Sequence, residues 1–191
     1  MLNKKLFDRL KKEYDAYALA RRELIGVSNV ALSKAKQAIF ALHRDDEVGS
    51  GALLAEVDKT FDGLEKQFAK NDGLRWEGAY RAALEEYVEA KLFYDFMVSG
   101  KIAEIKTVSL DADAYLAGLS DFTGELTRKA VQRATQGKTQ EVEKLAEIVR
   151  DVVEQLIKFD LTGYLRTKYD QAKQNLRRVE EVLYDIKMRR H

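Results

Sequence analysis

The sequence predicts an all-α protein, a bundle of about six or seven antiparallel helices in one domain over residues 1–191, and three observations predict it. The chain has no proline, whereas roughly one residue in twenty is proline in an average soluble protein. Apolar residues recur at three- and four-residue intervals almost throughout, which is the period of an amphipathic helix. Hydrophobic residues make up 46% of the chain, and the net charge is only +1, a balance typical of a globular protein and not of a disordered one.

The first third of the chain is expected to form a long helix, a shorter helix and a turn. Residues 3–44 carry the helical period as one helix or two, and Gly49-Ser50-Gly51 is expected to end that segment. The shorter helix that follows has a single apolar face, made by Leu53, Leu54, Val57, Phe61, Leu64 and Phe68. Asn71-Asp72-Gly73 is then a turn, in which Asp72 is expected to cap the next helix.

That next helix, residues 74–99, is apolar over most of its circumference. A helix that is apolar on nearly all sides is normally buried, so this one is expected at the centre of the bundle. Gly100 is expected to stop it, because glycine readily adopts the backbone conformation that ends a helix.

The last three helices are expected between capping residues and glycines. Ser109 or Asp111 offers a cap for a helix that runs to about Thr135 and is closed by Gly137. Residues 141–159 and 161–188 make the final two helices. The closing helix carries an apolar stripe that is either core or a subunit interface, since periodicity does not separate the two.

Composition excludes several classes of function. Without cysteine there is no disulfide framework, no thiolate nucleophile and no cysteine-based zinc site, and two histidines do not suffice for a site that needs several imidazoles. The chain carries no secretory-signal pattern and no apolar stretch of about 18 residues, so we expect a cytoplasmic protein without a membrane partner. His43, at the end of a helix, is expected to be a cap or a surface residue.

Two acidic residues occupy an unexpected side of the central helix. Glu86 and Glu89 fall opposite its narrow polar stripe, among aromatic side chains. Ionised carboxylates are costly to bury unless they are paired, hydrogen-bonded or bound to a metal. This side of the helix therefore borders a water-filled groove, forms ion pairs or binds a cation.

A second pair of acids lies in the following helix. Asp121 and Glu125 flank its apolar stripe and are accompanied by Gly118 and Gly124. Each glycine inside a helix costs roughly 1 kcal/mol relative to alanine, and close approach of another helix or a ligand is a reason to keep it. We therefore expect these acids to face a tight cleft.

Four carboxylates on two packed helices suit a hard divalent cation, Mg²⁺ or in its place Mn²⁺. Such an ion lowers the pKa of a bound water and neutralises charge on a phosphodiester that is being cleaved. From the residues alone, ion pairing is the simpler explanation of the buried acids, and the metal site is the alternative.

Four stretches of the chain resemble the translin family, and within it the Trax branch. They are Ala38-Ile39-Phe40-Ala41-Leu42-His43-Arg44, Leu84-Glu85-Glu86-Tyr87-Val88-Glu89-Ala90, Asp121-Phe122-Thr123-Gly124-Glu125-Leu126 and Val179-Glu180-Glu181-Val182-Leu183-Tyr184-Asp185-Ile186-Lys187. Their order and separation also resemble the family, so that the similarity covers most of the chain from about residue 30 onward. It implies a helical fold that assembles into a hollow shell, a homo-octamer or a similar oligomer, with a translin-like partner subunit as a further option.

The resemblance also implies a function. It implies a metal-dependent endoribonuclease that cleaves single-stranded RNA inside the shell, with Glu86, Glu89, Asp121 and Glu125 as the catalytic and metal-binding acids. The competing hypothesis is a translin-like protein that binds single-stranded RNA or DNA without cutting it. A third is a purely structural bundle whose acids are paired with Arg128 or Lys129.

Nucleic-acid contacts in the family come partly from a basic and aromatic stretch before the central helix. The corresponding residues here are Arg75, Trp76 and Arg81, and Arg44 is a further candidate. Arginine for phosphate and an aromatic ring for base stacking is the expected division of labour. From the residues alone, Trp76 is more often a core residue than a stacking platform.

Overall fold

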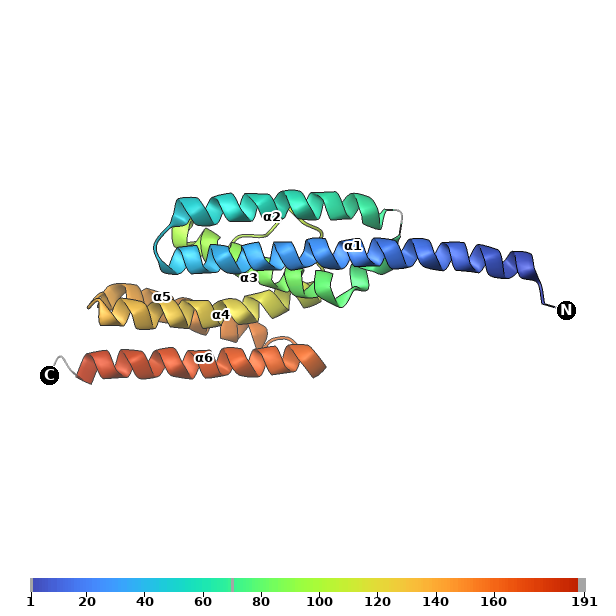
Figure 1. Cartoon of the computed structure of the whole chain (residues 1–191). Helices are drawn as coiled ribbons and strands as arrows, with labels where there is room; N and C mark the ends of the chain where they lie inside the picture. The colour runs from blue at the N-terminus through green and yellow to red at the C-terminus, as the bar shows by residue number, and fades with distance from the viewer. Residues whose placement is uncertain (1, 70, 189–191) are drawn as a thin grey trace.

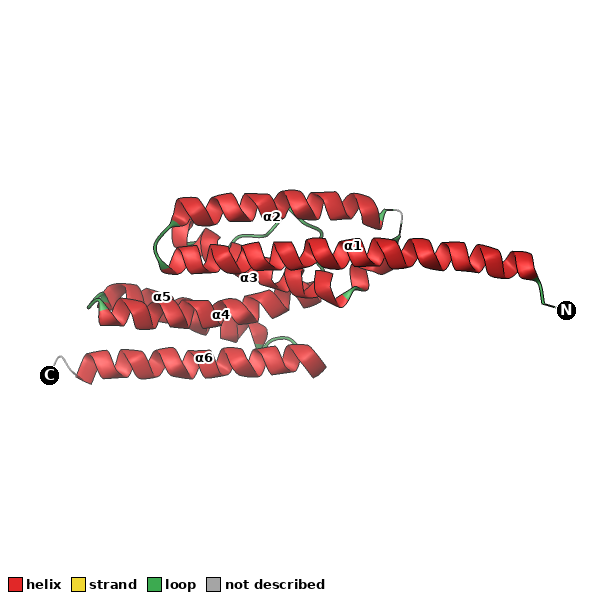
Figure 2. Cartoon of the chain, in the orientation of Figure 1, coloured by secondary structure: helices red, strands yellow, loops and turns green. Residues whose placement is uncertain are grey.

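The computed structural model describes residues 2–69 and 71–188, which form six α-helices and one short 3₁₀ helix (Figure 1). No strand occurs in this described part of the chain (Figure 2), so the all-α prediction is confirmed. The elements are α1 (Lys4–His43), α2 (Glu47–Phe68), η1 (Asp72–Trp76), α3 (Gly78–Ser99), α4 (Ala112–Thr135), α5 (Thr139–Leu156) and α6 (Gly163–Met188).

The helices are not all antiparallel to their neighbours. The helices α1, α3, α4 and α6 run in the same direction, and α2 and α5 run in the opposite direction, so each of these two is antiparallel to the helices before and after it (Figure 1). The parallel pairing of α3 with α4 arises because residues 100–111 carry the chain back along the bundle before α4 begins. This return places the middle of α3 beside the middle of α4.

The turn between α1 and α2 lies earlier than the glycines that were expected to form it. Asp45 has a φ of 62°, and the carboxylate of Asp46 caps α2 by accepting from the backbone N–H of Gly49 at 2.8 Å. A Cβ on Gly49 would lie 2.2 Å from the Asp46 carboxylate, so a glycine inside the helix makes room for the cap. The prediction of a break at residues 49–51 was therefore wrong.

The start of the central helix also differs from the prediction. Residues 72–76 form η1 and α3 begins only at Gly78, because Asp72 pairs with Arg75 at 3.0 Å and does not cap α3. The other boundaries follow the expected chemistry. Gly100 ends α3 with a φ of 70°, and the Asp111 carboxylate caps α4 by accepting from the N–H of Ala114 at 2.8 Å.

The apolar core runs through all six helices, and α3 lies at its centre, in contact with α1, α2 and α4. The rings of Tyr87 and Phe93 are completely buried there, as expected for a helix that is apolar nearly all round. The apolar stripe of α6 also faces this core, since Tyr169, Ala172 and Val179 are buried. That stripe therefore serves the fold of the chain itself.

The first half of α1 extends beyond the bundle (Figure 1). The first buried residue of α1 is Leu24, and the preceding turns expose the apolar side chains of Phe7, Leu10, Tyr14 and Tyr17. None of the helices described is both long and apolar enough to cross a lipid bilayer.

Candidate active site: a carboxylate cluster between α3 and α4

Close contact between two helices creates the site. A Cβ on Gly118 of α4 would lie 2.6 Å from the side chain of Val88 and 2.9 Å from the carbonyl oxygen of Glu85, both on α3. Only glycine allows the backbones to approach this far, which confirms the expected reason for one of the two glycines. The other, Gly124, lies instead beside Asn175 of α6.

The four predicted acids lie close enough to this crossing for their charges to act on one another. Burial raises the pKa of Glu89 to about 9, and the nearby charges of Glu86, Asp121 and Glu125 contribute to the increase. Burial likewise raises the pKa of Glu86, where Lys36 opposes the shift and the two acids of α4 add to it. Because carboxylates repel one another appreciably only at short range, these effects identify one cluster formed by α3 and α4.

A lysine from α6 neutralises part of this cluster. Lys168 donates a hydrogen bond to the carboxylate of Asp121, and its ammonium group lies 3.8 Å from Glu85. The hydroxyl of Tyr164 donates to Glu85 at 2.7 Å, so Glu85 belongs to the same polar region. Burial lowers the pKa of Lys168, but the hydrogen bonds and charges of Asp121 and Tyr164 together outweigh burial, so the net shift of the pKa is upward.

Two further cations lie at the exposed edge of the cluster. The ammonium group of Lys36 on α1 is 3.7 Å from the carboxylate of Glu86, and the guanidinium of Arg128 on α4 is 3.6 Å from that of Glu125. Among the residues that the structure describes, Glu89 has no such ion-pair partner. It is therefore the acid whose burial is least compensated.

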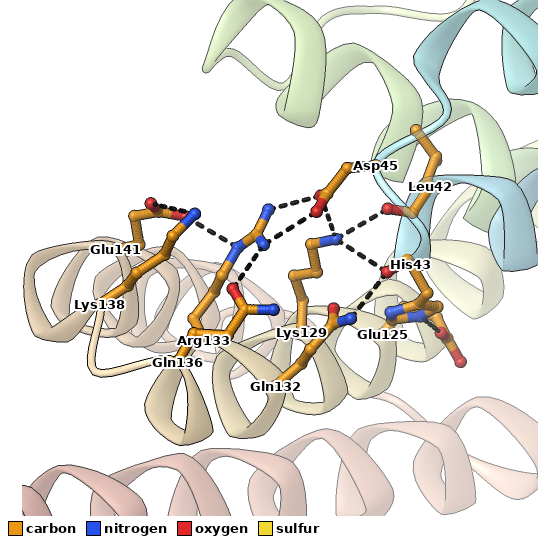
Figure 3. Close-up of polar contacts among 10 residues, drawn as sticks. All are labelled: Leu42, His43, Asp45, Glu125, Lys129, Gln132, Arg133, Gln136, Lys138 and Glu141. Carbon is orange, nitrogen blue, oxygen red and sulfur yellow. Dashed lines mark hydrogen bonds and ion pairs between the residues drawn. The ribbon is translucent and has the colours of Figure 1, made fainter.

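His43 is part of the site, and the expectation of a cap or surface residue was wrong. Its Nε2 forms a hydrogen bond with the Glu125 carboxylate (Figure 3). Its ring centroid lies 5.1 Å from that of Phe93. His43 is buried because it follows Ile39 by one helical turn on the inward face of α1. That spacing was the signal in the sequence that could have placed it.

Side chains of α4 hold the end of α1 in this position. Lys129 donates to the carbonyl oxygen of Leu42 at 2.8 Å and pairs with Asp45 at 2.7 Å, and Gln132 donates to the carbonyl oxygen of His43 at 2.9 Å (Figure 3). Lys129 thus binds the α1–α2 turn and not the four acids of the cluster, so the alternative in which it pairs with those acids was wrong. Arg128 does approach an acid, as that alternative expected.

The Translin family model matches residues 20–190 of the chain, which includes the whole carboxylate cluster. This chain belongs to the translin family.

Relatives that carry the Trax name are distant but cover most of the chain. A translin-associated protein X homolog of Schizosaccharomyces pombe is 21% identical and is matched over 86% of this chain and 79% of its own length. The translin-associated protein X of Pongo abelii is 24% identical, over 96% of this chain and 78% of its own. The crystal structure of AfC3PO superimposes with a TM-score of 0.88 at 22% identity, covering 96% of this chain and 98% of that one, and so shares the fold.

In this translin-family chain, three of the four predicted metal ligands, Glu86, Asp121 and Glu125, stand in ion pairs. Within residues 2–69 and 71–188, no three acidic or histidine side chains are grouped so as to hold a metal ion as they stand. The chemistry of the donor set nevertheless fits a hard divalent cation, because the four carboxylates supply only oxygen ligands and raise one another's affinity for positive charge. Binding would require Asp121 to exchange Lys168 for the ion.

Three of the four predicted RNA-binding residues lie together at the start of α3. Arg75, Trp76 and Arg81 line a cavity of about 240 Å³. Trp76 is 70% exposed, so the expectation that it is a core residue was wrong. Both guanidinium groups are already paired with carboxylates, Arg75 with Glu65 and Arg81 with Asp111, each through two hydrogen bonds.

Arg44, the fourth, lies far from the other three. Glu77, next to Trp76, pairs with Arg21 of α1, and the 23 positions from Arg21 to Arg44 span roughly 35 Å of helix. Arg44 instead follows His43 at the end of α1 that approaches the acids. The predicted set therefore divides between two places on the molecule.

Proposed function

We propose that this translin-family chain is a metal-dependent endoribonuclease that cleaves single-stranded RNA. One observation carries the proposal: four carboxylates from α3 and α4 form a partly buried cluster, in which burial first, and then the charges of the other three acids, raise the pKa of Glu89 to about 9. Such perturbed acids concentrate at functional sites. A structural neighbour described as an AfC3PO–duplex RNA complex, with a TM-score of 0.88, supports RNA as the ligand.

The roles follow from the positions of the side chains. Glu86, Glu89, Asp121 and Glu125 would hold Mg²⁺, or Mn²⁺ in its place, and orient the attacking water. When bound, the ion supplies Lewis acidity and neutralises charge that develops on the phosphodiester. His43 fixes the orientation of the Glu125 carboxylate through its hydrogen bond. In-line attack by water would leave a 5′-phosphate and a 3′-hydroxyl.

We further propose that the chain works in an oligomeric shell, a homo-octamer or a similar assembly, alone or with a translin-like partner subunit. The apolar side chains exposed on the first half of α1 support assembly, because a large exposed apolar surface commonly marks an interface. Light scattering that shows only a 21.8 kDa monomer would contradict this part. A cytoplasmic location remains a prediction.

Labelled single-stranded RNA, incubated with the protein in Mg²⁺ or in EDTA, tests the catalytic proposal. Cleavage in Mg²⁺ alone is expected, with a loss of at least about 100-fold in Glu86→Gln and Asp121→Asn. Asp95→Asn is the matched control, because Asp95 is on the same helix, is about as buried as Glu86 and is ion-paired with Lys91 at 2.7 Å. Cleavage that persists in the double variant would refute the site.

A non-catalytic protein that binds single-stranded RNA or DNA is the second candidate. The ion pairs of Asp121 with Lys168 and of Glu125 with Arg128 favour it, since a basic group already neutralises each acid. RNA binding without cleavage in Mg²⁺ or Mn²⁺ would support this candidate. If the protein neither binds nor cleaves RNA, the result supports a structural role for the acids.

A further inference from the structure

Phe40 is an exposed aromatic residue among buried neighbours. On the last two turns of α1, Ala38, Ile39, Ala41 and Leu42 are all buried, whereas Phe40 is 50% exposed. Exposing an aromatic ring at a position where the rest of the helix packs inward forgoes the gain in free energy that burial would bring. A ring in such a place is available to a ligand.

The ring lies against one cation and one helical turn from another, and both cations reach the carboxylate cluster. The guanidinium carbon of Arg128 is 4.9 Å from the Phe40 ring centroid, and the same guanidinium is 3.6 Å from Glu125. Lys36, one helical turn before Phe40, has its ammonium group 3.7 Å from Glu86. Both cations have side chains about half exposed, so Phe40 and the acids are joined by positively charged groups open to solvent.

We propose that Phe40 is the base-stacking platform for a nucleotide of single-stranded RNA beside the carboxylate cluster, with Arg128 stacked on the ring and Lys36 binding an adjacent phosphate. The proposal rests on the proposed function, because it places the substrate relative to the same four acids. The proposed platform is not the aromatic residue expected from the sequence. That residue, Trp76, lies just before the start of α3.

The chemistry of this surface favours a nucleic acid strand over other ligands. Every base has a π-face that can stack on an aromatic ring, and stacking of this kind contributes about 1–3 kcal/mol per base. An arginine on the ring adds a cation–π contact, and lysine binds phosphate as a point charge. Lys36, Phe40 and Arg44 also follow one another at four-residue intervals, so they share one stripe of α1 that a strand can follow.

Binding of labelled single-stranded RNA, measured by fluorescence anisotropy in EDTA, tests the proposal without any cleavage. Phe40→Ala is expected to weaken binding about 5- to 100-fold, the factor that corresponds to one stacked base. Phe40→Leu keeps the apolar bulk but removes the ring, so it should lose as much affinity, whereas Phe40→Trp should bind like the wild type. The salt dependence should be unchanged in all three, because no charge is removed.

Two controls make the result specific to this position. Phe159→Ala removes the same residue type at 52% exposure, just after the end of α5, and should leave affinity unchanged. Lys36→Gln should reduce the salt dependence by roughly one phosphate contact. Wild-type affinity in Phe40→Leu overturns the proposal. A change in molecular mass of Phe40→Ala in light scattering also overturns it, because Phe40 would then contact a second copy of the chain. If the wild-type protein does not cleave RNA, the proposed nuclease activity is refuted, but the effect of Phe40 on RNA binding still tests this proposal.

Discussion

The ammonium group of Lys129 lies completely buried against the carboxylate of Asp45, with 2.7 Å between Nζ and Oδ1. Asp45 sits in the turn after α1 with a positive φ, and Arg133 also binds its carboxylate (Figure 3). These bonds attach the end of α1 to α4. Since His43 is only two residues before Asp45, they also determine where the imidazole meets Glu125.

Lys129→Met is expected to destabilise the protein by about 2–4 kcal/mol. The substitution removes the buried cation that binds Asp45, and it leaves the carbonyl oxygen of Leu42 with the backbone N–H of Asp45 as its remaining donor. Loss of one partner of a buried pair has effects of this size. Asp45→Asn should cost less, because Asp45 is half exposed and an amide still accepts hydrogen bonds. Urea unfolding measures both changes, and a Lys129→Met midpoint equal to that of the wild type would show that the bonds contribute nothing net.

Gly118→Ala should destabilise the fold by about 1–3 kcal/mol, since the new methyl group would lie 2.6 Å from Val88 and force α3 away from α4. The matched control is Gly26→Ala, because Gly26 is also inside a helix and a Cβ there meets nothing within 4 Å. That control should be stabilising by about 0.5–1 kcal/mol. Adding Val88→Ala to Gly118→Ala should restore part of the lost stability. If stability does not recover, the contact with Val88 is not the cause of the loss.

Glu89→Gln should remove a pH dependence of stability. The pKa of Glu89 is about 9 in the folded protein and its ordinary value is 4.5, so between these pH values the folded state holds a proton that the unfolded chain has lost. Stability of the wild type therefore falls as pH rises through this window. Glutamine stays neutral, and the variant should be more stable at pH 8 by on the order of 1–2 kcal/mol. Parallel thermal midpoints of the two proteins from pH 5 to 9, in EDTA, would contradict the prediction.

Lys168→Gln should increase the stabilisation that Mn²⁺ provides. Without Lys168, Asp121 has no hydrogen-bonded cation, so a divalent ion meets less competition at the cluster and should raise the thermal midpoint more than in the wild type. Lys173→Gln removes a lysine from the same helix, paired with Asp170 at 2.6 Å, and should respond as the wild type does. If Mn²⁺ raises the thermal midpoint equally in all three proteins, Lys168 does not compete with a bound ion.

Helical phase was sufficient to single out the acids of the candidate site. Glu86 and Glu89 fall opposite the polar stripe of α3 whatever the neighbouring helices are, and Gly118 indicated the close helix crossing that the structure confirms. The boundaries were harder, because they depend on single side chains. One hydrogen bond, from Gly49 to the Asp46 carboxylate, moves the start of α2 ahead of the glycines that seemed to break it.

The partners of the acids could not be predicted in the same way. Lys168 is 47 residues from Asp121, and His43 is 82 residues from Glu125, so both contacts depend on how separate helices dock. Periodicity describes the faces of one helix at a time and carries no information on this docking. Trp76 was misplaced for a related reason, since it lies in the short η1 segment, where helical period does not apply.

The extension of α1 beyond the bundle gives one helix two regimes of local stability. Residues from about Ala20 onward are held by tertiary contacts, among them the pair of Arg21 with Glu77. The earlier turns depend on helix propensity, which is marginal for isolated segments of this length. Backbone amides should consequently exchange with deuterium ever faster from residue 20 toward residue 4. If another subunit covers Phe7 and Tyr14, deuterium exchange over this segment will slow as protein concentration rises. The exchange rate of the N-terminal turns would then measure assembly.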